Sequence, residues 1–483
     1  MMKDTPTMVG IGLVQTKPFD PILTEPILLM EEAAQAAFED TGNPFIKDSI
    51  DVVYVLRGFW GYREPGKYLI EKLSLGSNPK SILVKVGISQ QQIIDMASED
   101  IAHGKIRSAL IVGGEARYAL VQALKNQKQY HESDLPGEPD EYMKPEEELY
   151  QPQETDLMGL MAAPYYCIQE TAFRAAEKLS PQEHIERINT IYTNFSKVAQ
   201  DNPHAWDRKP YTAKDLMESP SNPMIAYPYT KKHNSDWNVN QASALILTSD
   251  ALANKLSIQK DKRVYPLQSA ENNHMMAVIQ RPNLALSKGL QLAGEKTLEF
   301  IGQHNLTDPI YEIYSCFPLA VQQFIKVLNL DPMTKLTVTG AMPFGGGPLN
   351  NYMLHSTAQM IEKLRENPGK VGLVTGVSGM MTKQGICLWA AEPITEFNVQ
   401  NVTTEAAQLD KAVPMSSVSE GVGKVLGYTV IYEKKLPVRA VFYCEDSKRE
   451  RKVLSSNNDQ IIQACMEGEW VHKELHFKNN LVV

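Results

Sequence analysis

A short stretch of this 483-residue chain places three reactive side chains side by side. Tyr314, Ser315 and Cys316 supply a phenol, a hydroxyl and a thiol. A phenol can donate a hydrogen bond to a carbonyl oxygen, and a thiolate can accept an acyl group. The alternatives are that Tyr314 is a packing aromatic and that Cys316 is a small buried apolar residue, which we favour for Cys316.

A glycine-rich turn could bind the same kind of group. Gly345-Gly346-Gly347-Pro348 precedes an expected helix at residues 353–364, and backbone N–H groups of such turns can bind a carbonyl or carboxylate oxygen. Tyr352 flanks the turn, and a phenol whose pKa is lowered by its site can act as a general base. His355 lies one helical turn further on. A lone histidine on a helix is more often a surface or capping residue.

Two further stretches supply candidates for substrate binding. In the loop 376–384 after an expected strand, Ser378, Gly379 and Lys383 are the candidates. Elsewhere, Gly87 follows an apolar stretch at 81–86. Ser89, with Gln92 three residues later, has the pattern of a capping box, so a capping role is favoured for its hydroxyl over a nucleophilic one.

Buried strands and amphipathic helices must position these residues. A helix that begins at Ser89 would have its N-terminus at the carboxyl end of the strand 81–86, where open α/β sheets bind ligands. Strands and helices alternate in two series with the same element order, which predicts mostly parallel sheets covered on both faces. The expected strands are residues 8–14, 50–56, 81–86, 108–112, 241–249, 264–269, 310–313, 335–339 and 371–375. The expected helices are residues 25–40, the helix from 89, 159–179, 180–198, 288–304, 314–328 and 353–364.

Two regions depart from this alternation. Residues 134–154 are acidic and contain prolines, and we interpret them as a solvated loop. From about residue 404 onward, the stretches 425–432, 438–444 and 472–477 read as short strands with charged turns. This pattern predicts a small β-rich C-terminal domain.

Composition limits the functional classes. The net charge is −9 and there is no long basic run, which argues against nucleic-acid binding as a main function. The five cysteines are spread out and form no CxxC pair, so we expect a reducing compartment, no disulfide framework and no metal site. No apolar run is long enough to span a bilayer, and the N-terminus has no signal-peptide core. We therefore expect a cytoplasmic protein.

In the order of these motifs the chain resembles the thiolase superfamily. The similarity rests on the strand–turn–helix unit around Gly87, on Tyr314-Ser315-Cys316-Phe317, on the glycine-rich turn and on the loop 376–384. Along its whole length the chain resembles thiolase-like proteins of type 1, which are related to the sterol-carrier-protein thiolases and carry an appended C-terminal domain.

This resemblance implies a fold and a domain layout. The expected fold is α/β, with five αβαβα layers built from two similar halves. Residues 1–260 would form the first half, including an inserted loop domain at about 120–230 that covers the coenzyme A ester, and residues 261–396 the second. Residues 397–483 would form a small, OB-like β-rich domain.

The resemblance also implies that the usual chemistry is missing. The position of the thiolase nucleophile is Gly87, that of the catalytic histidine is Gly347, and no cysteine occurs in the loop 376–384. Tyr314 occupies the position that orients a water of the oxyanion hole. We therefore expect binding of coenzyme A or an acyl-CoA thioester, with no covalently bound cofactor and without cysteine-dependent condensation or thiolysis.

Two alternatives remain open. Thiolase-fold aldolases of steroid side-chain degradation also lack the cysteine, so a C–C lyase that uses Tyr314 and Tyr352 on an acyl-CoA is one. A non-catalytic scaffold is the other. Thiolases pair through the strand matching 81–86, so either a homodimer or a monomer is expected. The cations that could pair with the phosphates of coenzyme A are Arg174, Lys178, Lys197, Arg208, Lys209, Lys231 and Lys232.

Overall fold

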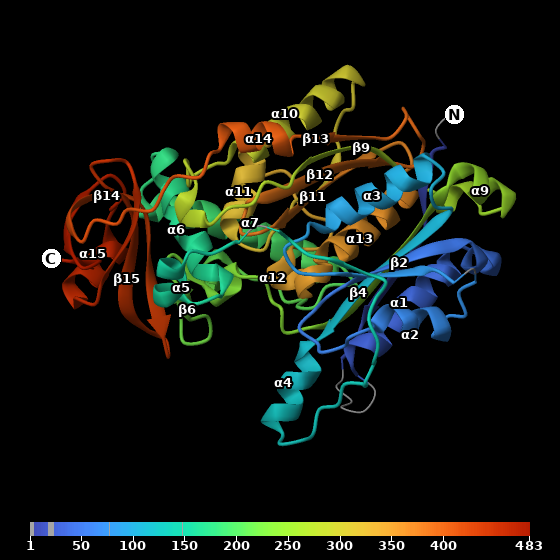
Figure 1. The fold of residues 1–483 in the computed structure, drawn as a ribbon, viewed down its shortest axis with the longest axis horizontal. Coiled ribbons are helices and arrows are strands. Elements are labelled where there is room, and N and C mark those ends of the chain that lie inside the picture. Colours follow the sequence, from blue (N-terminus) through green and yellow to red (C-terminus); the bar gives the residue numbers. More distant parts are fainter. Residues whose placement is uncertain (1–3, 18–23, 77, 147) are drawn as a thin grey trace.

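Three β-sheets organise the chain in the computed structural model, which describes residues 4–17, 24–76, 78–146 and 148–483 (Figure 1). The six-stranded sheet has one antiparallel strand, β8, between β1 and β4, and a parallel run from β4 to β5. Its order is β1 (Pro6–Gln15), β8 (Asn240–Ser249), β4 (Ser108–Ala116), β2 (Ile50–Leu56), β3 (Lys80–Val84) and β5 (Glu141–Met143).

The five-stranded sheet carries the second series of elements. Its β11–β12–β9 centre is antiparallel, and β10 and β13 add parallel strands at the two edges. The order is β10 (Ile310–Glu312), β11 (Val371–Ser378), β12 (Lys383–Ala390), β9 (Tyr265–Asn272) and β13 (Asn398–Asn401).

Two helices lie between these sheets, because α3 (Gln90–Ala102) and α13 (Tyr352–Glu366) each contact strands of both. Every residue of α13 from 352 to 361 is buried, as expected for a helix enclosed on all sides. α3 buries Ile93, Ile94, Ala97 and Ile101, whose spacing places them on one face of the helix. The other faces of the sheets are covered by α1 (Pro26–Asp40), α2 (Pro65–Lys72) and α10 (Lys288–Gln303).

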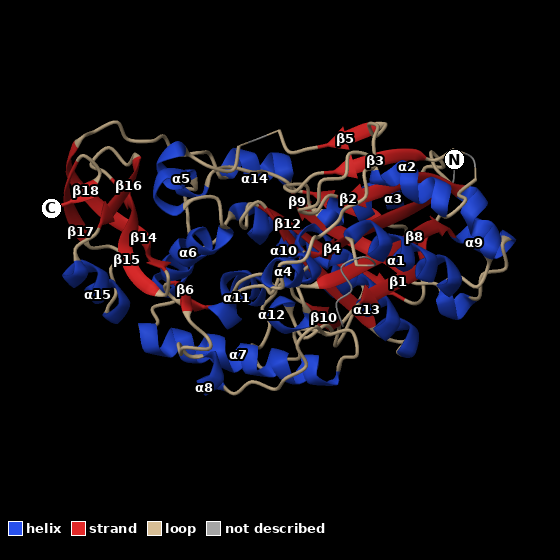
Figure 2. Ribbon diagram, turned by 90° about the horizontal axis from the view of Figure 1, so that it is seen from below, coloured by secondary structure: helices blue, strands red, loops and turns tan. Residues whose placement is uncertain are grey.

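The predicted β-rich C-terminal region is confirmed as a small barrel. β14 pairs with both β15 and β17, and β16 and β18 complete the ring (Figure 2). Two short strands from the middle of the chain, β6 (Met224–Ala226) and β7 (Tyr229–Thr230), extend this sheet beside β14. The barrel strands are β14 (Glu420–Glu433), β15 (Leu436–Glu445), β16 (Arg451–Ser456), β17 (Glu474–Lys478) and β18 (Leu481–Val482).

Helices of the middle region join the sheets to the barrel. α6 contacts β14 of the barrel and α11 of the second series. α7 follows its N-cap residue Ser180, where the sequence predicts a helix to start, and Ser180 and Glu183 form a capping box. The remaining helices are α4 (Arg117–Lys125), α5 (Pro152–Met158), α6 (Ala162–Ala176), α7 (Pro181–Asp201), α8 (Ala213–Leu216), α9 (Asp250–Lys255), α11 (Pro318–Val327), α12 (Met342–Gly345), α14 (Thr403–Leu409) and α15 (Asp459–Glu467).

Two predicted elements are wrong. Residues 335–339 form no strand, because the Glu312 carboxylate accepts the N–H groups of Val338 and Thr339 (2.7 and 3.1 Å). The helix expected at 314–328 begins only at Pro318. The acidic segment 134–154 is more than a solvated loop, because it supplies β5, which pairs with β3.

Across the described parts of the chain, no helix combines the length and the apolar character that crossing a membrane requires.

Candidate functional site

Gly87 lies in the turn between β3 and α3 with φ +104°, a conformation that side chains disfavour. A Cβ atom there would lie 2.8 Å from Cγ of Pro145, in the segment that follows β5. Both the backbone and the neighbouring proline therefore require glycine, and this conformation has no room for a nucleophilic cysteine.

Ser89 is the N-cap residue of α3, but the predicted capping box is wrong. Its hydroxyl makes no capping hydrogen bond and lies 3.9 Å from where a Cβ of Gly385 in β12 would be. The buried Ser89 Oγ has no hydrogen-bond partner, and neither has Oε1 of Gln90, Gln91 or Gln92. Buried polar atoms are normally paired, so this helix end has unused hydrogen-bonding capacity.

The glycine-rich turn lies against this helix end. Gln90 Nε2 donates to Asn350 Oδ1 (2.6 Å), so the structure brings the Gly87–Ser89 turn and the glycine-rich turn together. Asn351 accepts a hydrogen bond from Ser243 Oγ (3.1 Å), whereas its Nδ2 is buried without a partner. The sequence reasoning missed both asparagines. Their position directly after the glycine-rich turn was the available clue.

The glycine-rich turn itself is filled by its neighbours. A Cβ on Gly347 would lie 1.9 Å from Ser235 Oγ, so no histidine fits there in this conformation. The Gly347 N–H donates to the Asp236 carbonyl (2.8 Å), and this group is therefore not available to a ligand, contrary to the prediction. Gly346 has φ +100°, and Gln241 Nε2 donates to the Gly345 carbonyl (2.8 Å).

The two candidate tyrosines meet edge to face, with ring centroids 5.7 Å apart. Both are buried, and desolvation raises the pKa of each phenol above its ordinary value. Tyr352 OH also donates to Glu312 Oε1 (2.8 Å), and the carboxylate raises the pKa of Tyr352 further. Neither tyrosine has the lowered pKa that a phenolic general base needs.

Glu312 is a fully buried carboxylate that the sequence reasoning missed. Its Oε2 accepts hydrogen bonds from Thr337 Oγ1 (2.9 Å) and from the Val338 and Thr339 N–H groups, and its Oε1 from Tyr352 and Thr339 Oγ1 (3.0 Å). Burial raises its pKa while these donors oppose the shift. Five donors on one carboxylate hold the loop 337–341 in place. An acidic residue within a buried strand was the available clue.

Cys316 and His355 are both buried and uncharged at neutral pH. Burial raises the pKa of the Cys316 thiol to about 12, so it is not a thiolate. His355 is 1% exposed, its ring nitrogens have no hydrogen-bond partner, and burial lowers its pKa to about 3. The interpretation of His355 as a surface or capping residue is therefore wrong, because α13 is enclosed between two sheets.

The loop predicted at residues 376–384 is shorter in the structure, where only residues 379–382 connect two strands. β11 ends at Ser378 and β12 begins at Lys383, and these two residues pair directly. Gly379 has φ +59° in the connecting turn. Lys383 is buried, and its charge partly offsets the burial that raises the pKa of Glu271 in β9.

The expected phosphate-binding cations separate into two groups. Arg174 is 1% exposed and forms an ion pair with Glu469 (3.0 Å), so it is not available to a phosphate. Lys232 forms an ion pair with Asp207 (2.7 Å). The exposed members are Lys178, Lys197, Arg208, Lys209 and Lys231. Among the residues described, no three His, Cys, Asp or Glu side chains are placed to hold a metal ion.

Glu115 at the end of β4 makes the stability pH-dependent. Burial raises its pKa to about 7, although the Phe59 N–H (2.9 Å) and nearby Arg117 favour the charged form. The unfolded chain therefore loses this proton at a lower pH than the folded protein does, and the free energy of unfolding falls as pH rises from about 4.5 to 7.

We expect Glu115→Gln to raise the unfolding free energy at pH 8 by up to about 3 kcal/mol and to change it little at pH 4. Urea unfolding at both pH values measures this, with the exposed Glu474→Gln as control. An equal effect of Glu115→Gln at both pH values would contradict the assignment.

No family model matches the sequence, and no curated protein matches it either. Solved structures, in contrast, do match this chain. A monomeric SCP2-thiolase-like protein type 1 from Mycobacterium smegmatis is 23% identical, with a TM-score of 0.82 over 99% of this chain and 98% of that chain. The human mitochondrial 3-ketoacyl-CoA thiolase in complex with CoA is 16% identical, with a TM-score of 0.55 over 80% of this chain and 98% of that one.

A third solved structure is the Ltp2–ChsH2(DUF35) aldolase, which is 16% identical, with a TM-score of 0.59 over 82% of this chain and 100% of that one. The resemblance that the sequence predicts is thus confirmed at the level of the fold. The chain has the mixed α/β fold of the thiolase superfamily together with an additional small β-barrel.

Proposed function

We propose that this chain binds a coenzyme A thioester at the N-terminus of α3. The observation that carries the proposal is the cluster of buried, unpartnered polar atoms there: Ser89 Oγ, Gln90 Oε1, Gln91 Oε1 and Asn351 Nδ2. A CoA thioester offers amide N–H donors and carbonyl acceptors, which complement these groups. The fold that the chain shares with a thiolase solved in complex with CoA supports the choice of ligand.

The same residues argue against thiolase turnover. Gly87 and Gly347 have no side chains for the nucleophile and the general base, and the raised pKa of Cys316 keeps its thiol protonated. We therefore propose binding without cysteine-dependent condensation or thiolysis. Aldolase-type cleavage by Tyr314 and Tyr352 is less well supported, because both phenols have raised pKa values.

We also propose that the two main sheets, with α3 and α13 between them, form the five-layer arrangement of two similar halves. The outer position of α1 on the first sheet and of α10 on the second supports this. The boundaries 1–260, 261–396 and 397–483 are part of the same proposal.

The test is calorimetric titration of the protein with CoA, acetyl-CoA and a bulky acyl-CoA, together with a thiolysis assay on the same sample. We expect saturable binding without turnover. Ser89→Ala should weaken binding about fivefold, the value of one ordinary hydrogen bond, without loss of stability, because the hydroxyl has no partner in the free protein. Ser98→Ala on the same helix is the matched control, since its hydroxyl bonds to the Ile94 carbonyl (2.7 Å).

The outcomes separate the hypotheses. Clear thiolysis by the wild type would show that a nucleophile has been overlooked. No saturable binding of any thioester would contradict the proposal and leave the scaffold as the remaining function.

A monomer is the oligomeric state that the sheet edge favours. β5 pairs in parallel with β3 and covers the edge through which a thiolase-type dimer was expected. We expect light scattering to show a monomer, and Met143→Pro to produce a concentration-dependent dimer. The Met143 carbonyl accepts the Lys85 N–H (2.8 Å), so the backbone groups of residue 143 face β3, and proline there removes a donor to β3 and uncovers its edge. Met143→Thr, which keeps the backbone N–H, should remain monomeric. A wild-type dimer, or a Met143→Pro variant that stays folded and monomeric at high concentration, would contradict this role of β5.

A further inference from the structure

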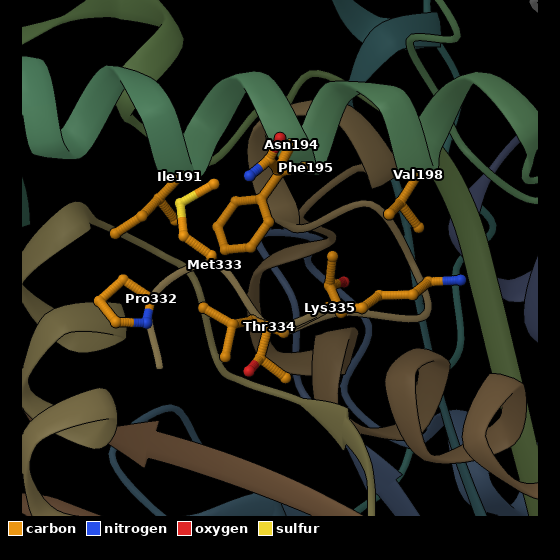
Figure 3. A pocket seen from close by; sticks show the side chains of 10 residues that line it. Ile191, Asn194, Phe195, Val198, Pro332, Met333, Thr334 and Lys335 are labelled. Atoms are coloured by element: carbon orange, nitrogen blue, oxygen red, sulfur yellow. The ribbon is translucent and has the colours of Figure 1, made fainter. Parts of the chain in front are cut away.

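The hollow of about 260 Å³ between α7 and the loop 331–337 has closed apolar walls (Figure 3). Ile191 and Phe195 of α7 and Leu336 of the loop line it, and each is only 2% exposed. A ligand finds more accessible side chains at the carboxyl edge of the six-stranded sheet, where open α/β sheets commonly bind ligands. At this edge the parallel strands β5, β3, β2 and β4 end side by side (Figure 2).

Each of these four parallel strands is followed directly by a cationic residue. In the order of the strands, the cations are Lys144, Lys85, Arg57 and Arg117. Lys144 is exposed and the other three are partly exposed. Within the described ranges of the chain, none of the four forms an ion pair. This edge of the sheet therefore presents positive charge that no neighbouring carboxylate pairs with.

Three of the cations form a row across neighbouring strands. The Arg57 N–H donates to the Val84 carbonyl (2.8 Å) and the Lys85 N–H to the Met143 carbonyl (2.8 Å), so the backbone pairing continues as far as these residues. Residues 57, 85 and 144 are therefore neighbours on one face of the sheet, in strands about 4.8 Å apart. Like charges directly opposite each other destabilise a sheet, and a bound anion relieves that repulsion.

The acidic residues at positions 138, 140 and 141 do not neutralise this row, because each pairs with a different cation. These ion pairs are Arg63–Glu138, Lys67–Asp140 and Lys80–Glu141. Glu146 is exposed and pairs with no member of the row. The Lys85 ammonium lies 5.2 Å from the centre of the Tyr142 ring. The row spans three strands, or roughly 10 Å, which matches a chain of two or three phosphate groups better than a single one.

An exposed aromatic ring continues this edge beyond the row. Phe59 is 58% exposed, and its N–H donates to Glu115 Oε1 (2.9 Å), which holds the segment beside β4. Its ring meets Trp237 edge to face, with centroids 5.2 Å apart, and the Arg117 guanidinium lies 5.8 Å from its centre. Nucleobases stack on such rings, and a guanidinium beside them adds cation–π attraction. The row and the ring together offer the two kinds of contact that a nucleotide needs.

We propose that this edge binds a nucleoside polyphosphate. Its phosphates contact Lys144, Lys85 and Arg57, and its base stacks on Phe59 beside Arg117. A nucleic-acid strand is a poorer match, because the net charge of the chain is −9. The same groups occur in a free nucleotide such as ADP and in the nucleotide end of CoA. The inference goes beyond the proposed thioester site, and an acyl-pantetheine, which lacks the nucleotide, tests that site separately.

Calorimetric titration of the full chain with ADP, adenosine, pyrophosphate and CoA tests the inference. We expect one saturable site for ADP, and adenosine, which lacks phosphates, should bind about tenfold more weakly. Arg57→Gln and Lys85→Gln should each weaken ADP binding about five- to tenfold, whereas Lys125→Gln, at the exposed far end of α4, should leave it unchanged. Phe59→Leu should weaken ADP binding about fivefold without changing pyrophosphate binding, and Phe45→Leu, at a 66% exposed ring, is its control.

Competition identifies the source of the nucleotide. If saturating CoA excludes ADP and Lys85→Gln weakens both, the edge holds the nucleotide end of CoA. If ADP binds CoA-saturated protein as well as it binds free protein, the ligand is a separate nucleotide. Lys144→Gln changes an exposed side chain, so it should fold normally and weaken ADP binding about fivefold even if the other variants do not fold. The inference is overturned if ADP shows no saturable binding to the wild type, if adenosine binds as tightly as ADP, or if the folded variants of the row bind ADP with unchanged affinity.

Discussion

Replacement of Glu312 by alanine is expected to lower the free energy of unfolding by about 4 kcal/mol or more, or to prevent folding. The Val338 and Thr339 N–H groups are buried and donate to this carboxylate, and an unpaired buried donor costs roughly 1–3 kcal/mol. Three hydroxyl partners and a cavity add to that cost. Denaturant unfolding followed by circular dichroism measures the difference.

Glu312→Gln is the informative control. Its amide oxygen can take the place of Oε2 and accept from Thr337, Val338 and Thr339, and its NH₂ group can donate to the Tyr352 and Thr339 hydroxyls, which are able to accept. We expect Glu312→Gln to cost about 1–2 kcal/mol and Tyr352→Phe about 1 kcal/mol. Equal losses for the alanine and glutamine variants would show that the carboxylate does not organise the loop 337–341.

The second large effect is expected at Arg174, which joins α6 to the barrel. Its guanidinium donates to Tyr428 OH (2.6 Å), Tyr227 OH (3.2 Å) and Glu469 Oε2 (3.1 Å) while being 1% exposed. Removal of one member of a buried charged network typically costs about 3–5 kcal/mol. We expect Arg174→Ala to cost about 3 kcal/mol, the low end, because Glu469 is 34% exposed and regains solvent.

Loss of the Arg174 hydrogen bonds between α6 and the barrel should also make unfolding less cooperative. Trp470 packs on Phe442 inside the barrel, with ring centroids 5.6 Å apart, so the ¹⁹F signal of a fluorotryptophan at this position reports on the barrel alone. In the Arg174→Ala variant we expect this signal to change at a lower denaturant concentration than the signal of a fluorotryptophan at Trp389 in β12. Glu469→Gln should cost about 1 kcal/mol or less and keep the transitions together. Coincident transitions in Arg174→Ala would refute the anchoring role.

Apolar runs and helix-start residues correctly predicted the strands and helices whose formation depends on neighbouring residues in the sequence. β2 follows from a run of apolar residues, and the starts of α3 and α7 follow from Ser89 and Ser180. Two of the errors involve partners distant in sequence. Residues 335–339 read as a strand because nothing nearby shows that Glu312 takes their N–H groups. β5 forms because its backbone pairs with the otherwise unpaired edge of β3.

The sequence predicted which turns carry the candidate residues more than it predicted the surroundings of those residues. It did not show that neighbouring side chains leave no space for a Cβ atom at Gly87 or Gly347. The roles of Ser89, Tyr352 and His355 depend on which groups surround them in three dimensions. Spacing along the chain could not show that Ser89 faces β12, that Tyr352 donates to Glu312 or that His355 is enclosed between two sheets.

The pairing of the middle of the chain with the barrel has a consequence for biosynthesis. The Tyr227 N–H donates to the Val430 carbonyl (3.0 Å), and Thr429 Oγ1 donates to the Tyr227 carbonyl (2.8 Å), across about 200 residues of sequence. While the ribosome is still translating the second half, residues 224–230 have no strand to join. A premature stop codon between residues 402 and 420 would leave this segment exposed to proteases and chaperones, even though every residue of the two main sheets would already have been made.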